Sequence, residues 1–330
     1  MKTAPLTRAR QARVLLGLLL GFVAFIFLGV MVGPDDTGPE IFTETTLLRL
    51  RLLRVLLAAV VGAGLAATGA ALQATLRNPL ADPYVLGVSG GAAMGGAIAV
   101  ALGAAAGLGL HAAAALGALG ATALLAWFLA RDRGGRAETA LLVGVTLNAF
   151  SWALVSVVRA TLPASKTQIL SVWLVGAVGY PSAADLTIAA AVTGAALLVL
   201  AFHSGELTLL RAGEEEASRL GVDVARARLR IYAACSLLVG VAVSTTGVIG
   251  FLGLIAPHAV RLTLSRDERL ALPAAALVGG AGLVLFDALA RGAFALFDSE
   301  IPTGALCAVI GAPLFAVGLW RKVTSPGAAP

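Results

Sequence analysis

The residues around Ser89 come closest to a catalytic motif. Residues 87–91 are Gly-Val-Ser-Gly-Gly, which fits the G-x-S-x-G pattern of a nucleophilic serine, and His258 could act as its base. Such a pair would suit an intramembrane serine protease. A nucleophilic serine of this type follows a strand, whereas Ser89 opens an apolar segment after a proline-rich loop, and we expect His258 at a cytoplasmic helix end. The protease is therefore kept only as an alternative.

Other patterns that would support chemistry are missing from the sequence. No lysine follows a glycine, so the chain cannot contain the phosphate-binding loop of an ATPase. The three histidines stand far apart at the ends of apolar segments, without the spacing of a metal site. Cys235 and Cys307 lie inside separate apolar segments, as small core residues would. We therefore expect no catalytic residue, no cofactor and no metal, in a chain that is not an enzyme.

Several charged residues lie inside or beside apolar segments, where charge is costly and suggests a function. Asp287 and Arg291 are four residues apart, so they can pair on one face of a helix. An alternative function for Asp287 is ion coupling in a secondary transporter. Arg51 and Arg54, together with Arg49, gather at the expected outer end of another apolar segment. They could extend along the membrane interface, or they could form a basic patch for an acidic partner outside the cell.

The composition identifies lipid as the solvent around these segments. Hydrophobic residues make up 59% of the 330 residues and charged residues 13%. With the 39 glycines added, apolar residues and glycine reach about 70%, against about half in soluble domains. A soluble globule of this size could not cover its surface, so we expect an all-α integral membrane protein. The net charge of +6 is scattered between apolar segments, which argues against binding to nucleic acid.

The apolar segments can be counted as transmembrane helices, each of which needs about 20 residues. A retained first span is expected at 14–33, and others at 50–75, 84–107, 111–130, 140–162, 185–203, 271–290 and 302–320. The uncharged segment 231–260 is too long for one upright span. If it turns back near residues 244–247, the chain has ten spans with both termini in the cytoplasm, and 18 of its 24 basic residues face the cytoplasm. This positive-inside bias favours ten spans over nine.

Small residues and short loops indicate one compact bundle. Lipid gives helices no hydrophobic reason to associate, so they pack through small residues such as those at 62–64, 69–71 and 90–93. The longest cytoplasmic interval, about 204–230, contains a short charged helix that Gly221 would end. This interval is either a solvated linker or a docking element for a cytoplasmic protein. We expect a single membrane domain over residues 1–330.

Nine short strings follow one another in a recognisable order, at 50–54, 69–73, 77–83, 86–91, 173–176, 213–221, 247–258, 302–304 and 311–313. In this order they resemble the permease subunits of the vitamin B12 and iron-siderophore (BtuC, FecCD) family of ABC importers. They cover nearly the whole chain. The resemblance implies a BtuC-like permease with ten transmembrane helices in the inner membrane. It also implies a homodimer that works with two cytoplasmic ATPase subunits and an extracytoplasmic substrate-binding protein.

The resemblance further implies roles for individual residues. Three outer arginines match positions that receive acidic residues of the binding protein: Arg51, Arg54 and Arg291. Five residues match the loop on which the ATPase subunits dock: Gly213, Glu214, Ala217, Leu220 and Gly221. Asn78 and Leu80 match positions that line the cytoplasmic gate. The second gate segment, 136–139, is Arg-Ala-Glu-Thr and departs from the small polar pattern of the B12 member.

The mechanism implied by the resemblance is alternating access. The binding protein delivers a bulky metal chelate, and ATP binding and hydrolysis in the partner subunits move the docking loops, which opens one gate and closes the other. A cargo of this size needs no tight ligand shell in the permease, so specificity would reside mostly in the binding protein. The breadth of the family favours iron siderophores and vitamin B12, and haem is a further candidate.

Overall fold

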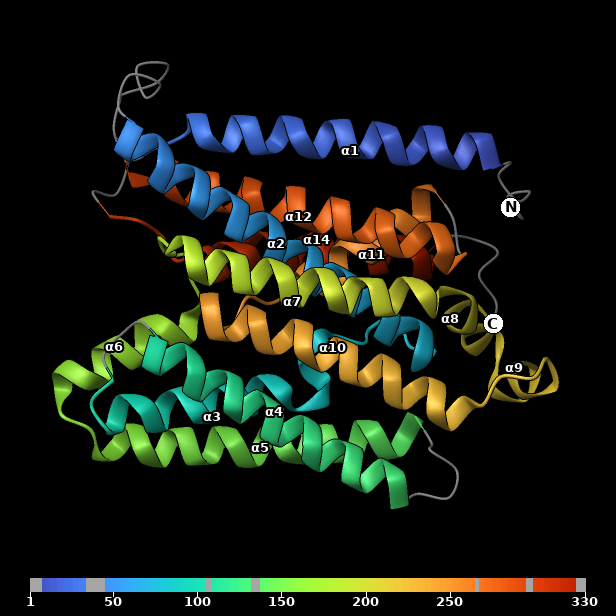
Figure 1. Ribbon diagram of the computed structural model, residues 1–330, viewed down its shortest axis with the longest axis horizontal. Coiled ribbons are helices and arrows are strands. Elements are labelled where there is room, and N and C mark those ends of the chain that lie inside the picture. Colours follow the sequence, from blue (N-terminus) through green and yellow to red (C-terminus); the bar gives the residue numbers. More distant parts are fainter. Residues whose placement is uncertain are drawn as a thin grey trace.

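The computed structural model describes residues 8–33, 45–104, 108–131, 137–264, 267–294 and 299–324. These residues form a bundle of helices that run roughly along one axis, without any strand (Figure 1). The expected all-helical fold is therefore confirmed. In chain order the elements are α1 (Arg8–Met31), α2 (Thr45–Thr75), the 3-10 turn η2 (Pro83–Leu86), α3 (Val88–Ala101), α4 (Leu108–Arg131), α5 (Ala137–Thr161), α6 (Ala164–Val175), α7 (Ala183–Phe202), α8 (Ser204–Ala212), α9 (Glu214–Arg219), α10 (Val224–Thr246), α11 (Leu252–Thr263), α12 (Glu268–Gly292) and α14 (Thr303–Thr324).

Most of the helices are long and apolar enough to cross a membrane. Seven meet this criterion among the described residues: α1, α2, α4, α5, α7, α10 and α12. α3 and the apolar part of α14 are shorter. The bundle buries 83% of the α2 span, whereas it buries only 11–22% of the spans of α1, α4, α5 and α7. α2 is therefore the central helix, and the exposed helices meet the lipid or another subunit.

The uncharged segment 231–260 forms two helices instead of one. α10 ends at Thr246, Gly247 has a φ of +70°, and α11 begins at Leu252. α11 has 12 residues and is about 18 Å long at the helical rise, roughly half of a bilayer. Its last turn brings Arg261 to Glu268, at the start of α12. The break expected near residues 244–247 is present, and the ten-span count and the cytoplasmic termini stay predictions.

The break between α10 and α11 is held by a side chain from a distant part of the sequence. The Tyr84 hydroxyl donates to the Ile249 carbonyl oxygen at 2.7 Å and accepts from the Ile249 N–H at 2.8 Å. Irregular backbone at membrane depth is tolerated only where its polar groups find partners. Tyr84 belongs to η2, and the Asp82 carboxylate caps this turn by accepting from the Tyr84 N–H at 2.9 Å. The break is thus fixed to the segment that precedes α3.

Glycines allow α2 to approach its neighbours closely. α2 meets α12 at Gly62 and Gly279, where a Cβ on either residue would collide with the backbone of the other. α2 meets α11 at Gly69 and Gly253, where a Cβ on Gly69 would lie 2.8 Å from the Gly253 Cα and closer still to its carbonyl oxygen. Helix association through small residues is therefore confirmed for the α2 segments at 62–64 and 69–71.

Two elements depart from the sequence expectation. The span expected at 84–107 is instead a 14-residue α3, entered through η2 and ending at Ala101. α6 was not expected, because its first turns contain Ser165, Lys166 and Gln168, which keep its hydropathy below that of a span. Gly176 ends α6 with a φ of +81°.

Candidate functional site

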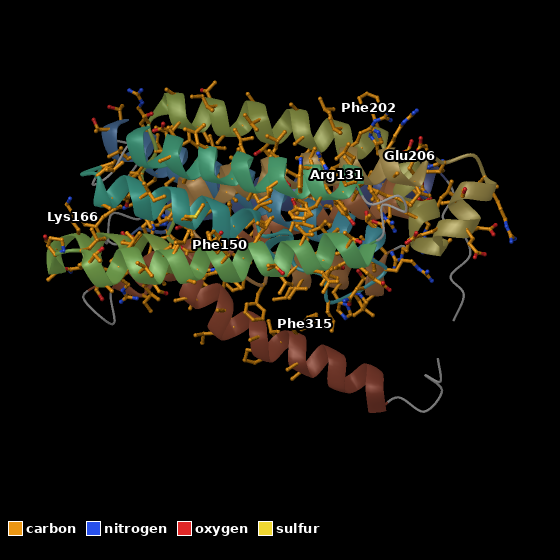
Figure 2. The ribbon with its side chains drawn as sticks, turned by 90° about the horizontal axis from the view of Figure 1, so that it is seen from below. Arg131, Phe150, Lys166, Phe202, Glu206 and Phe315 are labelled. Carbon is orange, nitrogen blue, oxygen red and sulfur yellow. The ribbon has the colours of Figure 1, made fainter. Side chains whose placement is uncertain are left out.

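Charged side chains gather at the two ends of the bundle. Lys166 and Glu206 mark opposite ends of the molecule in Figure 2. The outer end carries Arg54 in the third turn of α2 and Arg291 in the last turn of α12. The cytoplasmic end carries α8 and α9. These two names follow the topology that the basic residues predict.

Asp287 is the centre of a buried cluster at the outer end. Its carboxylate accepts from Arg54 Nε and Nη2 at 3.1 and 3.0 Å and from Arg291 Nε at 3.0 Å. Thr303 Oγ1 lies 3.4 Å away. The side chains of Asp287 and Arg291 are 0% exposed and that of Arg54 is 3% exposed. The expected pair of Asp287 and Arg291 is confirmed, and Arg54 joins it from α2, so the carboxylate anchors α2 to α12.

The C-terminus of α1 rests on two of the outer arginines. Arg291 Nη2 donates to the Gly29 carbonyl at 2.8 Å, and Arg291 Nη1 donates to the Val32 carbonyl. The buried Arg51 guanidinium occupies the space where Gly33 would carry a Cβ. Cationic groups stabilise the last carbonyls of a helix, which have no helical partner. Direct contact of Arg51 or Arg291 with another protein would require these side chains to leave their present positions.

Arg54 connects the buried cluster to the surface. Its Nη1 lies 2.9 Å from Oε2 of Glu300, a side chain that is 35% exposed. Its guanidinium carbon also lies 4.8 Å from the centre of the Tyr180 ring, in the range of a cation–π contact. Arg54 therefore joins the buried Asp287 to an acidic side chain that solvent can reach.

At the cytoplasmic end, α8 and α9 form the feature expected within 204–230. The expected short charged helix is α9, and Gly221 follows it with a φ of +87°. Gly213, with a φ of +151°, separates α9 from α8. Ala217 is wholly buried, whereas the Leu220 side chain is exposed. The two glycines thus shape the turns, Ala217 packs against the bundle, and Leu220 faces solvent.

Glu214 is held by a residue that sequence reasoning did not single out. Its Oε1 forms an ion pair with Nη2 of Arg228, which is almost wholly buried in the second turn of α10. The pair ties α9 to α10. In the sequence, Arg228 appears only as one of several cytoplasmic basic residues, and a separation of 14 residues across a loop gives no periodic signal.

The segment between α2 and η2 carries the expected gate residues. Asn78 Oδ1 accepts from the Leu80 N–H at 2.9 Å, and the Asn78 carbonyl accepts from the Ala81 N–H at 3.1 Å. Arg77 enters this turn with a φ of +51°. The turn leaves Leu80 half-exposed at the cytoplasmic end. Within 136–139, position 136 lies outside the described residues, and the other three positions begin α5.

Ser89 and His258 lie in different packing environments. Ser89 is buried in the first turn of α3, where its neighbours Gly87 and Gly90 pack against α5. His258 lies in α11, with its ring centre 5.9 Å from that of Phe315, which Figure 2 places on α14. In the described part of the chain, no group of three or more His, Cys, Asp or Glu side chains could hold a metal ion.

Together, these features define a class of protein. The structure is a polytopic helical membrane protein with a buried charge cluster at one end and a short, anchored helix exposed at the other. This arrangement defines a multi-pass integral membrane protein with an exposed helix that a soluble partner could reach.

Comparisons with known proteins identify the family. The model of the FecCD transport family matches residues 15–321. The chain is 34% identical over 320 residues to the hemin transport system permease HmuU of Yersinia pestis, covering 92% of this chain and 94% of that protein. It is 39% identical over 317 residues to the vitamin B12 import system permease BtuC of Vibrio cholerae, covering 95% and 94%. A solved metal-chelate type ABC transporter in an inward-facing conformation matches with a TM-score of 0.85 and 32% identity, covering 94% of this chain and 99% of that one.

The chain belongs to the FecCD transport family. It is the permease subunit of an ABC importer, in the inner membrane, and it is not an enzyme. Membership implies ATPase and substrate-binding partners. The alternatives of a serine protease using Ser89 and an ion-coupled transporter using Asp287 are not supported.

Proposed function

We propose that the chain works as a homodimer that moves a bulky metal chelate inward by alternating access. Two ATPase subunits would dock on the cytoplasmic end, and a substrate-binding protein on the outer end. Residues 1–330 would act as one permease domain. The relatives are named for haem, for vitamin B12 and, in Bacillus subtilis at 31% identity, for Fe(3+)-citrate. A metal held in an organic ligand is common to the three named cargoes.

The observation that carries the ATPase-docking proposal is the anchoring of α9. A solvated linker would be free of the bundle, whereas Ala217 and Leu210 are wholly buried and Glu214 is paired with Arg228. The short helix is therefore held in one orientation while Leu220 faces solvent. A preorganised element of this kind binds without a large ordering cost. Movement imposed on it by an ATPase subunit would pass into α8 and α10.

The test replaces Leu220 in the complex with its ATPase subunits. We expect Leu220→Asp to lower ATPase association by about tenfold or more, because it places a charge in an apolar contact. The matched control is Leu102→Asp, which changes another exposed leucine at the outer end of α3 and should leave association unchanged. Co-purification in detergent measures both variants. Equal retention of the ATPase by the two variants would reject α9 as the docking element.

At the outer end, Arg54 is proposed to meet an acidic residue of the binding protein in place of Glu300. Arg51 and Arg291 would then hold α1 and α12 beneath the contact. Glu300 competes with the incoming carboxylate in this arrangement, so Glu300→Gln should raise the affinity for the binding protein several-fold at low salt, where ion pairing is least screened. Arg54→Gln should lower it. Titration calorimetry measures both affinities. A weaker complex with Glu300→Gln would contradict the proposal that an acidic residue of the binding protein replaces Glu300 beside Arg54.

The homodimer is proposed to form through the exposed apolar sides of α5 and α14. Phe150 on α5 and Leu314 on α14 are exposed, and Figure 2 shows most of α14 standing away from the other helices. A bifunctional thiol reagent should cross-link the two subunits of a Leu314→Cys variant, because the introduced thiols would face each other across this interface. The native Cys235 and Cys307 are buried and should not react. The control is Leu16→Cys on the exposed side of α1. Equal cross-linking at both positions would reject this interface.

The cargo is proposed to be selected by the binding protein. A binding screen of that protein against cobalamin, haem and ferric chelates, followed by uptake into proteoliposomes of the complete complex, identifies it. Uptake that needs no binding protein would contradict this division of labour.

A further inference from the structure

We propose that the buried Glu268 connects α8, beside the ATPase-docking helix, to the gate segment that carries Asn78 and Leu80. The inference rests on the proposed function, because it assumes that force enters at α9 and that the gate is at residues 76–82. It assigns positioning roles to Glu268, Arg211, Arg261 and Gln73, which the resemblance does not include.

Glu268 joins three helices through one oxygen atom. It is the first residue of α12, and its side chain is 0% exposed. Its Oε1 accepts from Arg211 Nη1 of α8 at 2.8 Å and from Arg261 Nε and Nη2 of α11 at 3.2 and 2.9 Å. The Glu268 N–H also donates to Thr208 Oγ1 of α8 at 3.1 Å. α8 is therefore bonded to α12 through both the side chain and the backbone of Glu268.

Arg261 extends the connection to α2. Its Nη2 donates to the Ala70 carbonyl at 2.8 Å, and its Nη1 donates to Gln73 Oε1. Gln73 Nε2 in turn donates to the Ala81 carbonyl at 3.4 Å and to the Gly253 carbonyl at 3.2 Å. Ala81 closes the turn that begins at Asn78. A continuous series of direct contacts thus runs from α8 to the gate segment.

The burial of Glu268 explains why these contacts would move together. Separating Arg211 or Arg261 from a fully buried carboxylate leaves charge without a partner in a region of low dielectric constant, which is costly. A displacement of α8 therefore carries Glu268 and Arg261 with it. A cavity of about 350 Å³ lies beside the network, lined by Gln73, Arg77, Pro79, Arg211, His258, Arg261 and Leu262. Because Arg77 and Pro79 border this cavity, the gate segment has space in which to shift.

The experiment uses the complete complex with its ATPase subunits in proteoliposomes. Leu80→Cys introduces a thiol at the gate, where the native side chain is half-exposed, and both native cysteines are buried. The rate of maleimide labelling is measured with and without ATP and vanadate, in parallel with ATP hydrolysis. Glu268→Gln should reduce the nucleotide-dependent change in labelling by about fivefold or more, the lower range of allosteric coupling, while ATP hydrolysis continues.

A second variant separates transmission from folding. Arg211→Gln removes the ion pair between α8 and the Glu268 carboxylate, while Arg261 still bonds the carboxylate and Thr208 of α8 still accepts from the Glu268 N–H, so assembly should be preserved and the change in labelling should fall as in Glu268→Gln. The matched control is Arg230→Gln, an exposed arginine at the cytoplasmic end of α10, which should respond to nucleotide like the intact complex.

The outcomes distinguish the inference from the proposed function. If nucleotide changes labelling equally with and without Arg211→Gln, Glu268 does not transmit the movement and the inference is overturned, although the gate assignment stands. If nucleotide does not change the labelling rate of Leu80→Cys when Glu268 and Arg211 are both native, Leu80 is not at a gate. The proposed function then fails together with the inference.

Discussion

Gly69 gives a direct test of the close packing between α2 and α11. In Gly69→Ala the new Cβ would lie 2.8 Å from the Gly253 Cα and closer to its carbonyl oxygen, whereas non-bonded carbon atoms prefer about 3.5–4.0 Å. The helices must separate, and overpacking of this kind costs about 1–3 kcal/mol. The Gly253 carbonyl also accepts from Gln73 Nε2 at 3.2 Å, and loss of that hydrogen bond adds about 1 kcal/mol.

Thermal unfolding in detergent measures this cost through a thiol-reactive dye. Cys235 and Cys307 are both buried, so the dye reports exposure of the core. We expect the midpoint of Gly69→Ala to fall by about 3–6 °C, because an unfolding entropy of about 2.1 cal/mol/K per residue gives about 0.7 kcal/mol/K for 330 residues. The matched control is Gly120→Ala in α4, where a Cβ would have no neighbour within 4 Å. If the two variants melt together, α2 and α11 do not pack at Gly69, and the reasoning from glycine contacts is refuted.

Three further predictions concern stability and use the same dye assay. Asp287→Asn removes the counter-charge shared by Arg54 and Arg291, so we expect a loss of about 3–5 kcal/mol; an unchanged midpoint would mean that the cluster is not buried inside the bundle. Tyr84→Phe leaves the N–H and carbonyl of Ile249 without their shared hydroxyl, at about 1–3 kcal/mol for each group, and wild-type melting would show that other groups bond Ile249. Burial raises the pKa of Asp82 from 3.8 to about 6, although the hydrogen bond from the Tyr84 N–H acts to lower it. The Asp82 carboxylate therefore binds a proton more tightly in the folded state than in the unfolded state. The contribution of Asp82 to stability should then be fully present below pH 3.8 and be lost as pH rises through about 6, a fall that Asp82→Asn removes; an identical pH profile in the variant would contradict it.

The fold could be predicted largely from local features of the sequence. Apolar length predicts the long helices. The basic residues predict a return near 244–247, because the arginines on both sides of the uncharged segment then face the cytoplasm, and the structure has its break directly after Thr246. Gly62 and Gly69 indicate close packing, although the sequence does not show that their partners are Gly279 and Gly253. α6 was not predicted because it is short and begins with polar residues, so neither its length nor its hydropathy indicates a helix.

The sites depend on pairings that no local pattern reveals. Arg54 and Asp287 are separated by 233 residues, and only the packing of α2 on α12 brings them together. Of the cluster, the sequence predicts the pair of Asp287 and Arg291, because four residues form about one helical turn. It does not predict that Arg51 and Arg291 hold the end of α1, since a basic residue beside a span looks the same whether it faces solvent or a neighbouring helix. Glu268 is hidden for the same reason, because its partners belong to two other helices, α8 and α11.

The Tyr84 hydroxyl also bears on which segments of the bundle can separate from one another. Both polar backbone groups of Ile249 are bonded to this one oxygen, so separating η2 from the break before α11 would strip two groups of their partners at once. Lipid offers them no replacement, and only a water-filled cavity could do so. The contact between η2 and the break is therefore expected to stay dry throughout the transport cycle, so that these two segments move as one body and a hydrated path opens along other helices.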